Sequence, residues 1–127
     1  MFVFQDQPAK SVWDGVYTTE QAKRGAALYA TDCASCHGLG LTGGESAPPL
    51  TGGEFLSNWG GLTVGELFER IRTSMPADRP GKLTRAQNAD ILAHILNVGE
   101  FPPGSTELST QTEVLKQIRI VAVKPEH

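Results

Sequence analysis

The sequence predicts a single, mostly helical (all-α) domain, and three observations support this prediction. The chain has 127 residues, which is enough for one ordinary domain and too short for two of typical size. Four segments open with a threonine followed three residues later by Glu or Gln, the capping-box pattern that starts a helix. Stretches compatible with a helix follow these starts. The four pairs are Thr18 and Gln21, Thr63 and Glu66, Thr84 and Gln87, and Thr110 and Glu113.

The first predicted helix runs over about residues 19–32. Its interior contains Gly25, which destabilises a helix by about 1 kcal/mol relative to alanine. We therefore expect another helix to approach closely at Gly25. The buried stripe predicted from helical spacing comprises Ala22, Gly25, Ala26, Tyr29 and Cys33.

Two further helices are predicted at about residues 64–73 and 85–97, the latter ending before Gly99, a typical stop. Their inward residues are Val64, Leu67, Phe68 and Ile71 in the first, and Ile91, Leu92 and Ile95 in the second. The tail contains a segment compatible with a short helix at about 111–118 and a β-leaning stretch from Ile118 to Val123.

Residues 38–61 are rich in Gly, Pro, Ser and Thr and show no periodicity. A structureless loop of this length is unusual in a compact domain unless it surrounds something. The organisation predicted from these observations is an N-terminal extension over residues 1–17, a helical domain over 18–98 and a C-terminal extension over 99–127.

Composition excludes several classes of protein. Hydrophobic residues make up 39% of the chain, which argues against general disorder. Eleven basic and fourteen acidic side chains give a net charge of −3, which argues against nucleic-acid binding. No apolar run approaches the roughly 18 residues of a membrane span. The start, Met1 to Phe4, is too short for a signal-peptide core, so an export signal is expected to have been removed.

The strongest chemical signal is the C-x-x-C-H run of Cys33, Cys36 and His37. This spacing is typical of c-type haem attachment. Two thiols three positions apart can add to the two haem vinyl groups, and the adjacent imidazole can then bind the iron. A thioredoxin-like redox pair, a structural zinc site and a plain disulfide are the alternatives. The first lacks its βαβ context, and the second lacks a paired second motif.

Met75 is the predicted second axial ligand of the iron. It lies at the end of the stripe that begins at Val64, and Pro76 stops the helix directly behind it. The alternative is that Met75 fills the core. His94 is a competing ligand, although its place within the third helix favours helix packing. His127, at the chain end, is expected to be solvated.

Other residues are candidates for the surroundings of the haem. Pro48 has a carbonyl but no N–H, so it can accept a hydrogen bond from an iron-bound histidine. Leu50 is expected to help bury the haem. Trp59 either donates its indole N–H to a haem propionate or lies in the core. Three arginines are further propionate candidates, although such residues are usually solvated: Arg70, Arg72 and Arg79.

Together these residues resemble the class I cytochromes c. The resemblance spans about residues 18–98 and includes the C-x-x-C-H run, Pro48 to Leu50, Thr73 to Pro76, and Asp90 to Leu96. It implies an all-α cytochrome c fold of three core helices around one covalently bound haem c. It also implies that His37 and Met75 are the axial ligands, and that the Pro48 carbonyl accepts from His37. One departure is His94, which replaces an aromatic residue and weakens the usual helix contact.

The implied function is one-electron transport without an enzymatic activity of its own. The donor is expected to be a dehydrogenase or bc1-type complex and the acceptor a terminal oxidase, in a respiratory chain in the periplasm. The extensions resemble, more weakly, those of bacterial cytochromes associated with quinoprotein dehydrogenases. A monomer is expected. The alternatives are a fixed subunit of a dehydrogenase or oxidase complex, and a haem sensor or peroxidase in which Met75 dissociates from the iron.

Overall fold

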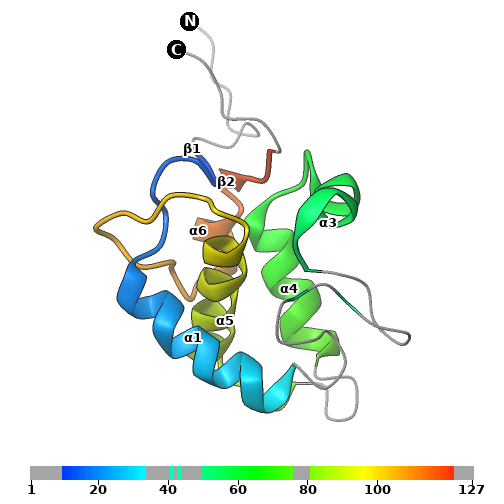
Figure 1. Cartoon of the computed structure of the whole chain (residues 1–127), viewed down its shortest axis with the longest axis vertical. Helices are drawn as coiled ribbons and strands as arrows, with labels where there is room; N and C mark the ends of the chain where they lie inside the picture. Colours follow the sequence, from blue (N-terminus) through cyan, green and yellow to red (C-terminus); the bar gives the residue numbers. More distant parts are fainter. Residues whose placement is uncertain (1–9, 34–40, 42, 44–49, 76–80, 122–127) are drawn as a thin grey trace, which may run out of the picture.

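A computed structural model describes residues 10–33, 41, 43, 50–75 and 81–121 of the chain. Helices dominate the described residues, and two short strands join the two ends of this part of the chain (Figure 1). In chain order the elements are β1 (Lys10–Ser11), α1 (Thr19–Asp32), α3 (Gly52–Trp59), α4 (Val64–Ser74), α5 (Arg85–Val98), α6 (Thr112–Leu115) and β2 (Ile118–Arg119).

The three main helices begin where the threonine pattern predicts. Complete capping boxes, with both the Thr and the Glu or Gln side chain hydrogen-bonded, start α4 at Thr63 and α5 at Thr84. Helix α1 has only half of a box, because Thr18 accepts from the Gln21 N–H while the Gln21 side chain turns elsewhere. That buried amide instead forms two hydrogen bonds with the backbone of Leu108, of 2.7 and 3.2 Å.

The predicted close approach at Gly25 is confirmed. Helices α1 and α5 cross there, and a Cβ placed on Gly25 would lie 1.7 Å from the Asp90 carbonyl oxygen. Only a residue without a side chain permits this crossing. The stripes predicted for α4 and α5 are buried in one core: Val64, Leu67, Phe68, Ile71, Ile91, Leu92 and Ile95.

The prediction of residues 38–61 as an aperiodic loop is wrong at its end, because Gly52–Trp59 forms helix α3. Two glycines at the start of α3 lower its intrinsic helix propensity, and Thr51 makes no side-chain cap bond. The helix depends instead on burial of Phe55, which is 2% exposed. The spacing of Phe55, Leu56 and Trp59 (i, i+1, i+4) is the signal from which this helix could have been predicted.

The capping box predicted at Thr110 is also wrong. Helix α6 is one turn long, Thr112–Leu115, and its N-cap is Gln111, which makes no side-chain cap bond. The predicted β-leaning stretch forms a strand only at Ile118–Arg119, and residues 122 and 123 lie outside the described part. Strand β2 pairs in parallel with β1, with Lys10 opposite Ile118.

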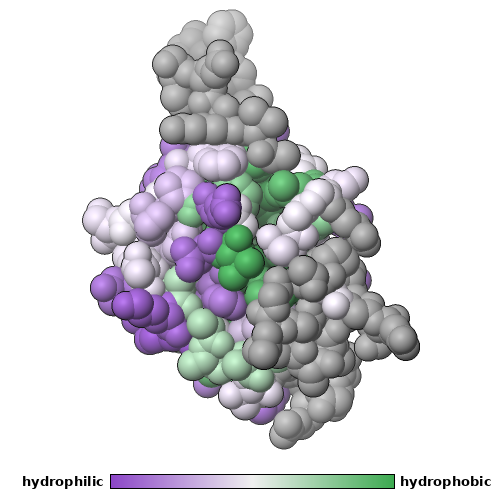
Figure 2. Space-filling model, in the orientation of Figure 1, coloured by the Kyte–Doolittle hydropathy of each residue, from purple (hydrophilic) through white to green (hydrophobic). Residues whose placement is uncertain are grey.

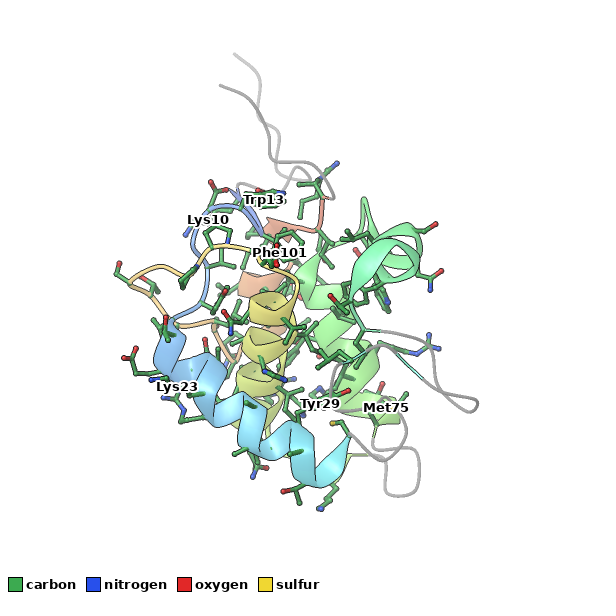
Figure 3. The ribbon with its side chains drawn as sticks, in the orientation of Figure 1. Lys10, Trp13, Lys23, Tyr29, Met75 and Phe101 are labelled. Atoms are coloured by element: carbon green, nitrogen blue, oxygen red, sulfur yellow. The ribbon has the colours of Figure 1, made fainter. Side chains whose placement is uncertain are left out.

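Both predicted extensions contribute to the core that the main helices form. Trp13 and Phe101 pack edge to face, with ring centroids 4.7 Å apart (Figure 3). The Trp13 indole N–H donates to the carbonyl of Val121 at 3.1 Å. Further buried side chains from these two regions are Val12, Val16, Tyr17, Leu108, Leu115, Ile118 and Ile120.

The surface shown in Figure 2 is uneven in polarity. Hydrophilic residues cover the N-terminal part of α1 on this face, the C-terminal part of α1 is weakly hydrophobic, and the most hydrophobic residues gather between α5 and α3. In the described part of the chain, no helix has both the length and the hydropathy needed to cross a membrane.

Candidate functional site

Cys33 lies at the C-terminal end of α1. Its backbone N–H donates to the Tyr29 carbonyl at 2.8 Å, which completes the last turn. The side chain is half-buried and packs against the hydrophobic core. Helix α1 therefore presents the first cysteine of the C-x-x-C-H run at the boundary between core and solvent.

Tyr29 is buried one turn before Cys33 and is 1% exposed. Burial, and to a lesser extent an electrostatic interaction with the neighbouring Cys33, raise the pKa of Tyr29 to about 12. The phenol therefore stays protonated at neutral pH. On its other side the Tyr29 ring meets His94 of α5, with ring centroids 5.3 Å apart.

His94 thus makes an aromatic contact between α1 and α5, although the sequence predicted a weaker helix contact at this position. Burial lowers the pKa of His94, because the charged imidazolium is poorly solvated there. The neutral imidazole is also the form that binds metals, so the lowered pKa is compatible with His94 as an iron ligand as well as with helix packing.

Met75 lies at the C-terminal end of α4. Its backbone N–H still donates to the Ile71 carbonyl at 2.9 Å, but its own φ and ψ of −123° and 150° are extended. The following Pro76 disfavours helical geometry in the preceding residue, which explains this exit. The side chain is half-buried and packs against the core. In the view of Figure 3, Met75 and Tyr29 lie at the same end of the molecule.

Leu50 and Leu41 join the two ends of the segment that contains Pro48. The Leu50 N–H donates to the Leu41 carbonyl at 2.7 Å. Leu41 has a φ of 63°, in the left-handed region that destabilises a non-glycine residue by about 1–2 kcal/mol. Its side chain is fully buried, and burial of a leucine contributes about 1.5–3 kcal/mol, which offsets this strain.

A mainly apolar cavity of about 240 Å³ lies between α3 and the C-terminal end of α5, with Leu50 on its wall. The sequence singled out Leu50 as a cofactor contact but not the residues opposite it. Trp59, at the end of α3, is half-buried and packs against the core. The cavity is lined by Leu50, Thr51, Gly52, Phe55, Leu56, Ile95, Val98, Gly99, Glu100 and Phe101.

Several residues predicted for the site lie outside the described part of the chain: Cys36, His37, Pro48, Arg79 and His127. Of the remaining arginine candidates, Arg72 pairs with Glu69 on the same helix at 2.7 Å. Arg70 is exposed on α4.

The fold and these residues define a cytochrome c. Residues 20–95, more than half of the chain, match the family described as cytochrome c oxidase, cbb3-type, subunit III. The chain belongs to this family, has the all-α cytochrome c fold, and carries covalently bound haem c with its iron. Its general function is therefore haem-based electron transfer.

A solved structure supports the fold. The chain is similar to one chain of the sulfane dehydrogenase SoxCD from Paracoccus pantotrophus, with a TM-score of 0.56 and 24% sequence identity. The match covers 84% of this chain but only 61% of the SoxCD chain. At this level of identity the similarity concerns the fold alone.

The described residues fit a haem. Cys33 supplies a thiol at a partly exposed helix end, and Met75 supplies a soft thioether at the end of a helix on the same core. The cavity beside Leu50 is mainly apolar, as a haem pocket would be, although neither Cys33 nor Met75 is among its lining residues.

Proposed function

We propose that this protein is a one-electron carrier with no enzymatic activity of its own. In this proposal Cys33 and Cys36 attach the haem, His37 and Met75 are its axial ligands, and the Pro48 carbonyl accepts from His37. The observation that carries the proposal is the position of Cys33 and Met75. Both lie at helix ends, half-buried against one core.

The haem, when bound, supplies an iron that changes between Fe(II) and Fe(III). The side chains of the protein determine how strongly each state is favoured. Leu67, Phe68 and Ile71 of α4 are buried on the helix that ends at Met75, and they exclude water from that side of the core. Such apolar surroundings disfavour the additional charge of the oxidised state, and a thioether ligand acts in the same direction. We therefore expect a positive reduction potential.

Two other residues are proposed to shape the cofactor pocket. Leu50 is on the wall of the apolar cavity, which supports a direct contact with the haem. Trp59 ends α3 as a half-buried side chain, so its indole N–H is proposed to hold a haem propionate at the protein surface. We further propose residues 18–98 as the haem domain, with 1–17 and 99–127 as extensions that add side chains to its core.

The cellular setting is also proposed. Thioether attachment takes place outside the cytoplasm, which supports a periplasmic carrier in a respiratory chain, and we propose that this carrier is a monomer. A dehydrogenase is the proposed donor, since the chain resembles part of a dehydrogenase, SoxCD. A bc1-type complex is an alternative donor, and a terminal oxidase is the proposed acceptor. Docking is expected to be small, brief and partly electrostatic.

A redox-titrated visible spectrum, combined with the mass of the denatured protein, tests the carrier. The expected result is one covalently bound haem per chain, a reversible one-electron transition at positive potential, and a methionine–iron band in the oxidised spectrum. The matched variants Cys33→Ala and Cys36→Ala should each retain a single thioether bond. A denatured native chain with the mass of the bare polypeptide would contradict the proposal.

A fixed subunit of a dehydrogenase is the second candidate, because the structurally similar chain is part of such an enzyme. Gel filtration of the native protein from its source separates the two. A free carrier elutes as a monomer, whereas a subunit elutes with the dehydrogenase activity.

A further inference from the structure

Phe101 lies just beyond the C-terminal end of α5 and lines the apolar cavity that also has Leu50 on its wall. It is buried, at 5% exposure. Phe101 and Trp13, which packs edge to face on it, both lie outside residues 20–95, the part of the chain that matches the family. The family match therefore assigns no role to this pair of aromatic residues.

The backbone of Phe101 is held at both of its polar atoms. The N–H donates to the Leu96 carbonyl at 3.1 Å, the hydrogen bond that closes a Schellman motif at the end of a helix. The carbonyl accepts from the buried Tyr17 hydroxyl. The residue before Phe101 is strained, because Glu100 has a φ of 68°, in the left-handed region that glycine usually occupies at this position. The turn thus fixes Phe101 at the expense of strain at Glu100.

The ring of Phe101 is enclosed by two further contacts. Gly99 has a φ of −74°, which any residue can adopt, but a Cβ there would lie 3.1 and 3.3 Å from two carbon atoms of the Phe101 ring. The glycine therefore makes room for the ring. On the other contact the Trp13 ring lies at 72° to it, and the Trp13 indole N–H is bound in turn to the Val121 carbonyl. The N-terminal segment therefore fixes the position of the Phe101 side chain.

The cavity that Phe101 lines is the one whose wall includes Leu50, the proposed haem contact. In the view of Figure 3, Trp13 and Phe101 lie together, toward the opposite end of the molecule from Tyr29 and Met75. We propose that Phe101 closes this cavity around the haem edge remote from Cys33, and that Trp13 is a positioning residue that holds Phe101 there.

This inference rests on the proposed function, because it takes Leu50 as a contact of the haem. Its consequence concerns the reduction potential. Burial is one of the properties by which a protein sets the potential of a haem, since water stabilises the additional charge of the oxidised state. A side chain that keeps water out of the cavity therefore raises the potential, and displacement of Phe101 should lower it.

The test measures the reduction potential and the thermal midpoint of the holoprotein in four variants: Phe101→Leu, Trp13→Leu, the double variant of these two, and Leu115→Ala. Leu115, on α6, is fully buried but is not among the residues that line the cavity, so its variant controls for a loss of stability. The double variant shows whether Trp13 acts through Phe101, because two residues that act through one contact are not additive.

Phe101→Leu should lower the potential by about 59 mV, which for one electron corresponds to a tenfold change in the equilibrium between Fe(II) and Fe(III). Trp13→Leu should lower it by a smaller amount, and should add nothing further in the double variant. Leu115→Ala should lower the thermal midpoint and leave the potential unchanged.

A native potential in Phe101→Leu or in Trp13→Leu, additive shifts in the double variant, or an equal shift in Leu115→Ala would overturn the inference. Because Trp13→Leu leaves Phe101 in the chain, it decides the question even where Phe101→Leu does not fold. A native protein without covalently bound haem would overturn the proposed function as well, so the two failures are distinguishable.

Discussion

Cys33 lies at the end of α1 and Met75 at the end of α4, and each of these helices makes a close packing contact through a glycine. The two glycines contact different partners. Gly25 on α1 lies against the backbone of α5, at the crossing of two long helices. Gly65 on α4 lies against α6, a single turn of the tail, where a Cβ would be 2.6 Å from Lys116 Cγ and 2.7 Å from its backbone nitrogen. The first contact joins two main helices, whereas the second attaches the tail to the helix that ends at Met75.

This difference predicts unequal tolerance of an added methyl group. A long helix packed along its length cannot move away from a clash, whereas one turn joined to loops can shift as a unit to relieve it. The α1–α5 crossing should therefore be far more sensitive than the α4–α6 contact.

The largest effect is expected for Gly25→Ala. The new methyl group would overlap the Asp90 carbonyl, so the free energy of unfolding should fall by about 3 kcal/mol, the upper end for overpacking. Urea unfolding of the holoprotein measures this change. Ala27→Gly, on the exposed face of α1, is the control and should cost only about 1 kcal/mol through helix propensity. A smaller loss for Gly25→Ala than for the control would contradict the rigid crossing.

Gly65→Ala should lower the free energy of unfolding by only about 1–2 kcal/mol. Its main effect should be local, with faster hydrogen exchange over residues 112–117 as α6 moves away from α4. Lys116→Ala added to Gly65→Ala removes the side-chain part of the clash but leaves the backbone part. The double variant should therefore recover only some of the loss, and complete recovery would show that the backbone contact is unimportant.

The smallest effect concerns the polar contact beside Gly65. Glu69 of α4 accepts from Arg72 and from the Thr112 hydroxyl of α6, and Arg85 lies 3.8 Å away. The hydrogen bond from Arg72, followed by that from Thr112, lowers the pKa of Glu69 from its usual 4.5 to about 2. The lowered pKa means that the stabilisation is complete above about pH 4.5 and is lost as the pH falls towards 2.

Because Glu69 is one-third exposed, this contribution should be below about 1 kcal/mol. Unfolding measured between pH 6 and 2 (roughly the range over which such a carboxylate titrates) should show a shallower decline in Glu69→Gln than in the native protein. Identical slopes would show that Glu69 contributes nothing to the attachment of α6.

The contrast between the two glycines also indicates what the sequence could predict. Gly25 lies in the interior of a long helix with clear helical periodicity, where glycine lowers helix stability. The sequence therefore predicts a packing contact that compensates for this loss. Gly65 is the second residue of α4, where glycine is tolerated, and its nearest contact is Lys116, 51 residues away in a segment with little periodicity. Local pattern alone therefore predicted a close helix approach at Gly25, without identifying α5 as the partner, and it did not predict the attachment of the tail.

The capping motifs show the same limit. Thr63 and Thr84 form complete boxes, and within the described residues the Glu66 and Gln87 side chains bond only to these two threonines. Gln21 has the same spacing from its threonine, but its side chain hydrogen-bonds to the buried backbone of Leu108 instead. Sequence spacing does not predict this tertiary contact. Helix α3 was missed because two glycines obscure its start, although its aromatic spacing is helical.

For the site, the sequence predicted residue types and their order, and the structure adds where some of them lie. Cys33 and Met75 were predicted from a motif and from a helix followed by proline, and both lie at helix ends against the core. The contact of Tyr29 with His94, the Leu41–Leu50 hydrogen bond and the contact of Trp13 with Phe101 depend on tertiary packing. Spacing within the chain does not reveal them.

The central claim is that Met75, and not His94, is the second axial ligand of the iron. Visible spectra and redox titrations of the holoprotein variants Met75→Ala and His94→Ala, measured side by side, test it most directly. Met75→Ala should lose the methionine–iron band and have a lower potential while its haem stays covalently bound, and His94→Ala should keep both the band and the potential. An unchanged spectrum in Met75→Ala, or loss of the band only in His94→Ala, would contradict the account.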